Sequence, residues 1–197
     1  MTSRRGGWWG IAFVVMLFVG STMASLPTGT QGGREIQAFY AAHATVVLVQ
    51  QVLGVVALGF LLAFAVALGA LRRRWLLVAA VLLAITELAT NIPPTILAVG
   101  NLGPDGAHAL TVVEDLADGA LSISIAVFSV AASIDQVGWV RAAGWLVAAL
   151  ALLHVGMTPL GIRAFDIVAP SSFLVLVLIL SIRLLLGRPT PEVQPRR

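Results

Sequence analysis

Six apolar stretches follow one another along the 197-residue chain, and they limit its fold more than any other feature. They cover residues 8–26, 45–71, 75–99, 109–133, 139–157 and 167–186. A helix of about 20 apolar residues matches the hydrocarbon core of a bilayer. The sequence therefore predicts an all-α fold, a polytopic transmembrane bundle of about six helices.

The composition agrees with a membrane domain. Hydrophobic residues make up 59% of the chain and charged residues 11%, whereas soluble domains have about 45–50% and about 25%. The segments between the apolar stretches are short and rich in glycine, proline and charge. We therefore expect a single transmembrane domain over residues 1–190, followed by a cytoplasmic tail over residues 191–197.

Several kinds of reaction and binding site are excluded because the residues that they require are absent. The chain contains no cysteine, which excludes disulfides, thiolate metal sites and cysteine nucleophiles. All 12 of its basic residues other than histidine are arginine, so no lysine is present to form a Schiff base. No glycine-rich phosphate loop occurs, and the arginines flank apolar stretches instead of forming a basic domain. We expect neither nucleotide chemistry nor a nucleic-acid partner.

The arginines indicate the orientation of the bundle. With an even number of spans, most of them fall on one side, and only Arg34 and Arg163 fall on the other. Positive residues in short loops mark the cytoplasmic side, so both termini are predicted to face the cytoplasm, in a bacterial cytoplasmic membrane. Four tryptophans begin helices on that side, as an interfacial belt requires: Trp8, Trp9, Trp75 and Trp139.

The first stretch has an alternative interpretation as a signal peptide. Arg4 and Arg5 precede it, and small residues near Ala24 resemble a cleavage site. Its apolar part is longer than the usual signal core of about 7–15 residues. We therefore favour a membrane anchor.

The fourth stretch carries the clearest polar pattern. Its polar residues recur at spacings of three, four or seven, which places them on one helical face: Thr111, Asp115, Asp118, Ser122, Ser129 and Ser133. Glu114 lies one turn from Asp118. Three carboxyl groups thus crowd the outer third of this helix, and a shared proton or a bound cation would relieve their repulsion.

A second polar face lies in the third stretch. Glu87 and Asn91 are separated by one helical turn, just before Pro93 and Pro94, which should break the helix. At 1.5 Å per residue, Glu87 lies roughly 18 Å from the cytoplasmic end, near or just past the midplane. Asp118 enters from the opposite side to a similar depth. Because a short loop joins the two helices, we expect antiparallel neighbours whose polar faces meet.

The three histidines, His43, His108 and His154, are all predicted on the outer side. With a nearby carboxylate they would suit zinc, and two of them would suit haem. No local ligand signature is present, and histidines at a membrane interface are more often solvated than bound to metal.

The polar residues also have structural interpretations. Glu114 and Asp115 would be stable at the water boundary near a helix N-terminus, and Asp118 and Glu87 would be satisfied by hydrogen bonds to neighbouring helices. Gln50 and Gln51 fit interhelical hydrogen bonding. Asp166 fits a local ion pair with Arg163.

Five short strings also resemble a known family. They are Leu26-Pro27, EIQAFYAAH at 35–43, Phe64 before the arginine turn, EDLADGA at 114–120 and GWVRAAGW at 138–145. In this order they resemble an uncharacterised family of small multi-pass actinobacterial membrane proteins, a domain of unknown function. The resemblance implies the six-helix topology and no catalytic residue. Relatives tend to have one acid opening the fourth helix, where this chain has three.

Three kinds of function are compatible with these features. The first is a non-enzymatic carrier, sensor or accessory subunit that binds a cation or a proton through Glu87, Asn91, Glu114, Asp115 and Asp118. The second is an intramembrane zinc hydrolase of lipid-like substrates that uses the three histidines, with an acid as general base. The third is a structural helper for a membrane-protein partner. We favour the first, and with it a protein that is not an enzyme.

Overall fold

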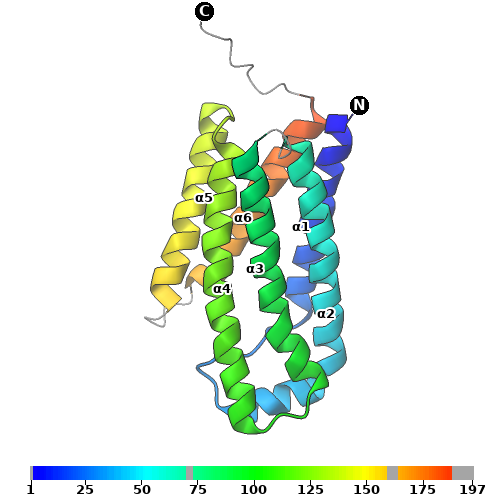
Figure 1. Cartoon of the computed structure of the whole chain (residues 1–197), viewed down its shortest axis with the longest axis vertical. Coiled ribbons are helices and arrows are strands. Elements are labelled where there is room, and N and C mark those ends of the chain that lie inside the picture. The colour runs from blue at the N-terminus through cyan, green and yellow to red at the C-terminus, as the bar shows by residue number, and fades with distance from the viewer. Residues whose placement is uncertain (1, 70–72, 159–163, 188–197) are drawn as a thin grey trace, which may run out of the picture.

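The computed structural model describes residues 2–69, 73–158 and 164–187. It contains six helices (Figure 1): α1 (Thr2–Met23), α2 (Gly33–Ala67), α3 (Arg74–Val99), α4 (Pro104–Ser133), α5 (Gly138–Met157) and α6 (Ala164–Leu185). Each of the six is long and apolar enough to cross a membrane. The described residues form no strand. The predicted all-α bundle of six such helices is confirmed.

The helices form a closed ring in chain order. Each packs against its neighbours in the sequence, and α6 returns to pack against α1. In Figure 1, α2, α3 and α4 stand side by side in front, and α6 runs behind them. The fourth helix also contacts α2 and α6 across the ring, which makes it the most central element. The antiparallel packing of α3 and α4 was expected from their short connection.

The second helix begins at Gly33 and not, as predicted, at residue 45. Its added turns carry Ile36 and Tyr40, which pack with Val47 of the same helix and with Leu97 and Ala107 in a small apolar cluster. The outward residues of these turns are small or polar, so their mean hydropathy falls below that of a membrane span. The helix continues because one face is buried, although the segment as a whole is not apolar.

The third helix is not broken at its two prolines. It continues through Pro93 and Pro94 as far as Val99, so the predicted break is wrong. Each proline removes one backbone donor, but side chains reinforce the preceding turn. The Thr90 hydroxyl and the Asn91 amide both donate to the carbonyl of Glu87, at 2.8 and 2.6 Å. The lower part of α3 bends toward α2 in Figure 1.

The helices differ in length by nearly a factor of two. The 20 residues of α5 extend about 30 Å, the thickness of a hydrocarbon core, whereas the 35 residues of α2 extend about 52 Å. Figure 1 shows α2, α3 and α4 reaching well below the lower end of α5. The bundle therefore has a full ring of six helices above and a projection of three below.

The main core lies in the full ring and is aromatic at its centre. Phe173 of α6 makes edge-to-face contacts with Phe13 of α1 and Phe128 of α4, with ring centroids 6.1 and 5.9 Å apart. Close helix contacts surround it. A Cβ atom at Gly144 of α5 would overlap the side chain of Ser133 on α4. Such small residues allow helix backbones to approach closely in a membrane.

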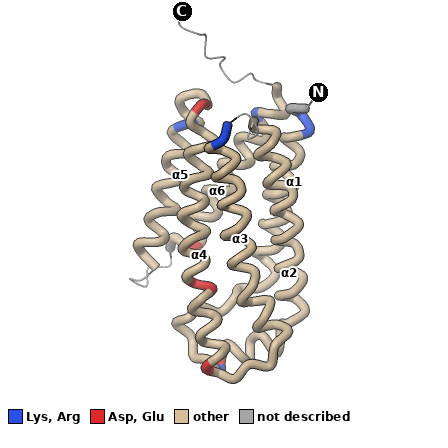
Figure 2. The backbone as a smooth tube through the Cα atoms, viewed as in Figure 1, with Lys and Arg blue, Asp and Glu red and all other residues tan. Residues whose placement is uncertain are grey.

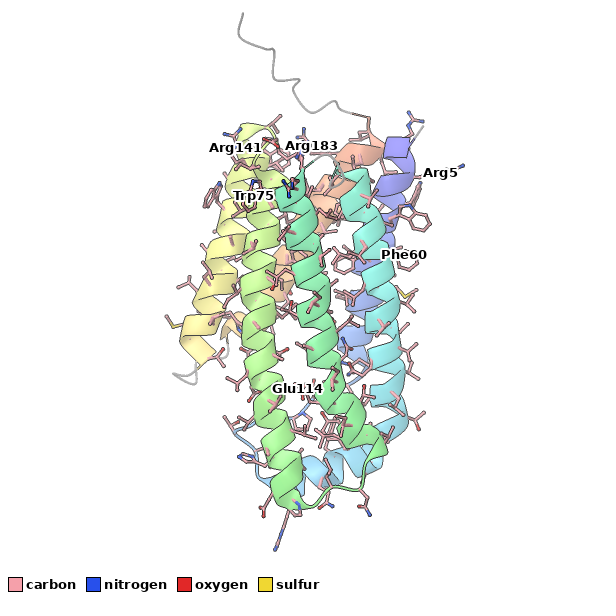
Figure 3. All side chains as sticks on the ribbon, viewed as in Figure 1. Arg5, Phe60, Trp75, Glu114, Arg141 and Arg183 are labelled. Atoms are coloured by element: carbon pink, nitrogen blue, oxygen red, sulfur yellow. The ribbon has the colours of Figure 1, made fainter. Side chains whose placement is uncertain are left out.

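One end of the bundle gathers the arginines, and we call it the arginine end. Figure 2 shows most of the blue residues at the upper end of the bundle and most of the red residues in the lower half. Figure 3 labels the exposed Trp75 at this end, as it does Arg141 and Arg183. Arg73 Nη1 pairs with Asp135 Oδ2 at 3.0 Å, which ties the start of α3 to the turn after α4. Arg163, and with it the predicted pair with Asp166, lies outside the described residues.

Candidate functional site

A cavity of about 280 Å³ lies between α1, α2, α3 and α4, and the loop that joins α1 to α2 also lines it. We call it the carboxyl cavity. Its polar lining comes from all five of these elements: Ser21, Thr28, Gln50, Gln51, Glu87, Thr90, Asn91, Glu114, Asp115 and Asp118. Aliphatic side chains of Met16, Leu17, Leu26 and Leu121 complete the wall.

All five residues predicted to bind a cation or a proton line this one cavity. Glu87 and Asn91 come from α3, and Glu114, Asp115 and Asp118 come from α4. The prediction that the polar faces of these two helices meet is therefore confirmed. The sequence supplied the necessary spacing, because residues one turn apart share a helix face.

The carboxyl groups of the cavity act on one another electrostatically. Glu87 interacts with Asp118, and Glu114 interacts with both Asp118 and Asp115. Asp118 also senses Asp166 of α6. None of the described residues that line the cavity is an arginine or a histidine. Four acidic side chains thus share a small space without a basic neighbour in its lining.

Glu114 is the most buried of the four acids. Its residue is 6% exposed, Glu87 and Asp115 are half-buried, and Asp118 is exposed. Exposure therefore does not follow position along α4, since Asp118 lies one turn deeper than Glu114 but is more exposed. Burial here depends on which helix covers each face of α4, and Glu114 is on the side that faces α3 (Figure 3).

A buried oxygen of Glu114 has no hydrogen-bond partner among the described residues. This oxygen is Oε2. The buried hydroxyl of Tyr40 on α2 is in the same state, and it interacts electrostatically with Glu114. Leaving a buried acceptor unpaired costs about 1–3 kcal/mol. The interior around Glu114 therefore contains unpaired polar atoms of two kinds, a carboxyl oxygen that accepts and a tyrosine hydroxyl that can donate or accept.

The loop between α1 and α2 is held to the cavity by one of its acids. The backbone N–H of Gly29 donates to Asp115 Oδ2 at 2.9 Å. A Cβ atom at Gly29 would lie 2.7 Å from the same oxygen, so only glycine fits this approach without a shift. Leu26, Pro27 and Thr28 thereby close one side of the cavity. Sequence reasoning missed this loop because nothing in its residues indicates where it folds back.

Two glutamines that were predicted only to hydrogen-bond between helices also line the cavity. They are Gln50 and Gln51 of α2. Like Glu114 Oε2, Gln50 Oε1 is a buried oxygen without a partner among the described residues. One turn along α2, Gly54 allows Asn91 to approach, since a Cβ there would lie 3.1 Å from Asn91 Oδ1. The signal was present in the sequence as two adjacent polar residues within an apolar stretch.

The polar face of α4 lines the cavity over only part of its length. Its acids line the cavity, but Ser122, Ser129 and Ser133 do not. The hydroxyl of Ser133 donates to the Val130 carbonyl of its own helix, and the Ser133 side chain packs where Gly144 of α5 approaches. Small polar residues are common at helix–helix contacts in membranes. The upper part of the face thus serves packing.

The three histidines are not brought to the carboxyl cavity. His43 stacks on Phe39, and its Nδ1 lies 3.0 Å from the Phe39 carbonyl oxygen one turn away. His108 is exposed at the start of α4. His154 Nδ1 lies 3.3 Å from Asp166 Oδ1, between α5 and α6. Across residues 2–69, 73–158 and 164–187, no three histidine or acidic side chains are grouped closely enough to hold a metal ion.

Comparisons of the chain with protein-family models, with curated proteins and with solved structures found no match. The resemblance to a family of small multi-pass membrane proteins therefore stays a prediction.

Proposed function

We propose that this chain is a multi-pass protein of the bacterial cytoplasmic membrane whose carboxyl cavity binds a proton or a small cation. Four acids line the cavity, Glu87, Glu114, Asp115 and Asp118, and no described lining residue is basic. This observation carries the proposal. Acids that line one cavity of low dielectric constant repel one another, and a proton or a hydrated cation would compensate them. The proposal does not require direct coordination of a metal ion by three of these side chains, since no three of the described residues are close enough for it.

The position of the cavity along the helices supports access from one side. Counted from the arginine end of α3, Glu87 lies about 20 Å along the helix. Counted from the same end of α4, Glu114 lies about 28 Å along it. Both values fall in the far part of a hydrocarbon core of about 30 Å. With the arginine end in the cytoplasm, the cation would come from the outer side.

The cavity suits a carrier, a sensor or an accessory subunit. Ionisable residues at membrane depth commonly line ion pathways or bind ligands. The hydrogen bond between Gly29 and Asp115 connects the site to the loop between α1 and α2. A cation that competes for this carboxylate would release the loop, which is a change that a partner subunit can detect.

The proposal is tested by titrating the purified protein with Na⁺, K⁺, Mg²⁺ and Ca²⁺ by calorimetry at pH 6 and pH 8. Two buffers of different ionisation enthalpy reveal any exchanged proton. We expect saturable cation binding or proton release, both reduced in Asp118→Asn and Glu114→Gln. Asp105→Asn removes an exposed acid from the same helix and should leave binding unchanged. Binding that is absent, or equal in all four proteins, would rule the proposal out.

The orientation has its own test, because the chain contains no cysteine. A single cysteine introduced by Glu35→Cys or by Asp135→Cys is the only thiol in its protein. A maleimide that cannot cross the membrane should label the first in intact cells and the second only after lysis. The reverse pattern would invert the topology.

A further inference from the structure

The carboxyl cavity is much larger than a bare ion. A water molecule occupies about 30 Å³ in the liquid, so a cavity of about 280 Å³ has the size of a compact organic molecule. It is at the lower limit of the pockets that bind small ligands, which begin at about 300 Å³. A monatomic cation would leave most of this space to water.

The wall of the cavity has two chemically different parts. Oxygen acceptors from α2, α3 and α4 form one part, and the aliphatic side chains of Met16, Leu17, Leu26 and Leu121 form the other. An inorganic cation has no use for the aliphatic part. A ligand with a charged head and a short hydrocarbon body would use both.

The unpaired atoms of the wall specify the head of this ligand. Glu114 Oε2 on α4 and Gln50 Oε1 on α2 are buried acceptors without a partner among the described residues, and both residues line the cavity. Acceptors are satisfied by N–H donors. A primary ammonium group carries three such donors and one positive charge, whereas a quaternary ammonium group carries none and is typically bound by aromatic faces.

We infer that the carboxyl cavity binds a primary aliphatic amine, whose ammonium group is held by Glu114 and Gln50 and whose hydrocarbon body lies against Met16, Leu17 and Leu121. This inference rests on the proposed function, since it names the class of cation. The ammonium group belongs either to a soluble amine or to the headgroup of an aminolipid. Both sources present the same donors to the same acceptors.

The test uses n-butylammonium chloride on the purified full chain in a lipid-free detergent. Calorimetry is run at equal ionic strength against sodium chloride, tetramethylammonium chloride and n-butanol. We expect saturable binding of butylammonium, with an affinity at least about tenfold above those for sodium and tetramethylammonium, and no binding of n-butanol. The affinity for butylammonium should fall by about tenfold or more in Glu114→Gln, because a hydrogen bond to a charged group is lost. Gln50→Ala gives a second reduction should Glu114→Gln fold poorly. Asp105→Asn is the control that keeps the wild-type affinity.

A parallel arm separates the two sources of the ammonium group. The protein is reconstituted in nanodiscs of phosphatidylcholine with or without phosphatidylethanolamine, and its thermal unfolding is measured. Protection by phosphatidylethanolamine, lost in Glu114→Gln, together with no response to butylammonium, assigns the headgroup as the source. Two results would overturn the inference. One is the absence of any response to butylammonium and to phosphatidylethanolamine, and the other is binding of sodium or tetramethylammonium as tight as that of butylammonium. Cation or proton binding that persists in that case leaves the proposed function standing, and loss of all binding removes both.

Discussion

The half of the bundle near the arginine end and the half around the carboxyl cavity are built from the same helices but differ inside. In the first, phenylalanines from α1, α4 and α6 contact one another, and glycines bring backbones together. In the second, acids and amides surround a cavity and some of their oxygens are unpaired. A dry, filled interior holds helices together. An interior with unmet hydrogen bonds lowers the stability of the fold, and the proposed ligand would compensate for this cost.

The comparison predicts the largest loss of stability from the aromatic core. Phe128→Ala removes a side chain that is fully buried and contacts Phe173. We expect the free energy of unfolding in mixed micelles to fall by about 3–5 kcal/mol, as for buried phenylalanines elsewhere. Leu116→Ala, on an exposed face of the same helix, is the control and should change little. Equal effects of the two variants would break the comparison.

A smaller loss is expected from filling a helix contact. Gly144→Ala places a methyl group where Ser133 already lies, and overpacking of this kind costs about 1–3 kcal/mol. Gly156→Ala, in the same helix, meets open space and should be neutral or slightly stabilising. Thermal unfolding of the two variants measures the difference. A neutral Gly144→Ala would mean that α4 and α5 do not pack closely.

Neutralising a cavity acid should act in the opposite direction. Glu114→Gln removes a buried charge that Asp115 and Asp118 repel, and it adds N–H donors of similar shape. We expect the free energy of unfolding at pH 8 to rise by about 1 kcal/mol while ligand binding is lost. Asp105→Asn should lower it by about 0.5 kcal/mol, because an acid in the first turn of a helix is favourable. A strongly destabilised Glu114→Gln would show that this carboxyl group serves the fold.

The smallest effect is expected at the surface of the arginine end. Arg73 and Asp135 form an ion pair whose side chains are 29% and 51% exposed. Their coupling energy, measured by a double-mutant cycle with Arg73→Gln and Asp135→Asn, should be about 0.2–1 kcal/mol and should decrease with salt. A coupling as large as the effect of Gly144→Ala would place stability in surface charge instead of packing.

The fold was predictable because each membrane span can be recognised from the apolar residues of its own segment. The six apolar stretches gave the number of helices, and the spacing of Glu87, Asn91, Glu114 and Asp118 gave the face of each helix. The first turns of α2 were missed because they are stabilised by contacts with Leu97 and Ala107, which are distant in the sequence. A window of mean hydropathy cannot detect a helix with only one buried face.

The candidate site was predictable only in part, and for a related reason. Two neighbouring helices joined by a short loop had to bring Glu87 and Asp118 near each other. The approach of Gly29 to Asp115, the position of Gln50 in the cavity lining and the separation of the three histidines depend on how distant helices pack. The break predicted at the prolines of α3 was wrong for another reason. Thr90 and Asn91 support the helix that Pro93 and Pro94 were expected to end.

The unequal lengths of the helices determine which part of the purified protein a detergent leaves uncovered. A detergent belt covers about the 30 Å that α5 spans, so the longer α2 and α4 extend beyond it below the ring (Figure 1). These projecting helix ends would give antibody fragments an epitope that is continuous with the helices lining the carboxyl cavity. A fragment bound at residues 33–45 would add mass for imaging a 20.6 kDa chain and would leave the cavity free to be occupied.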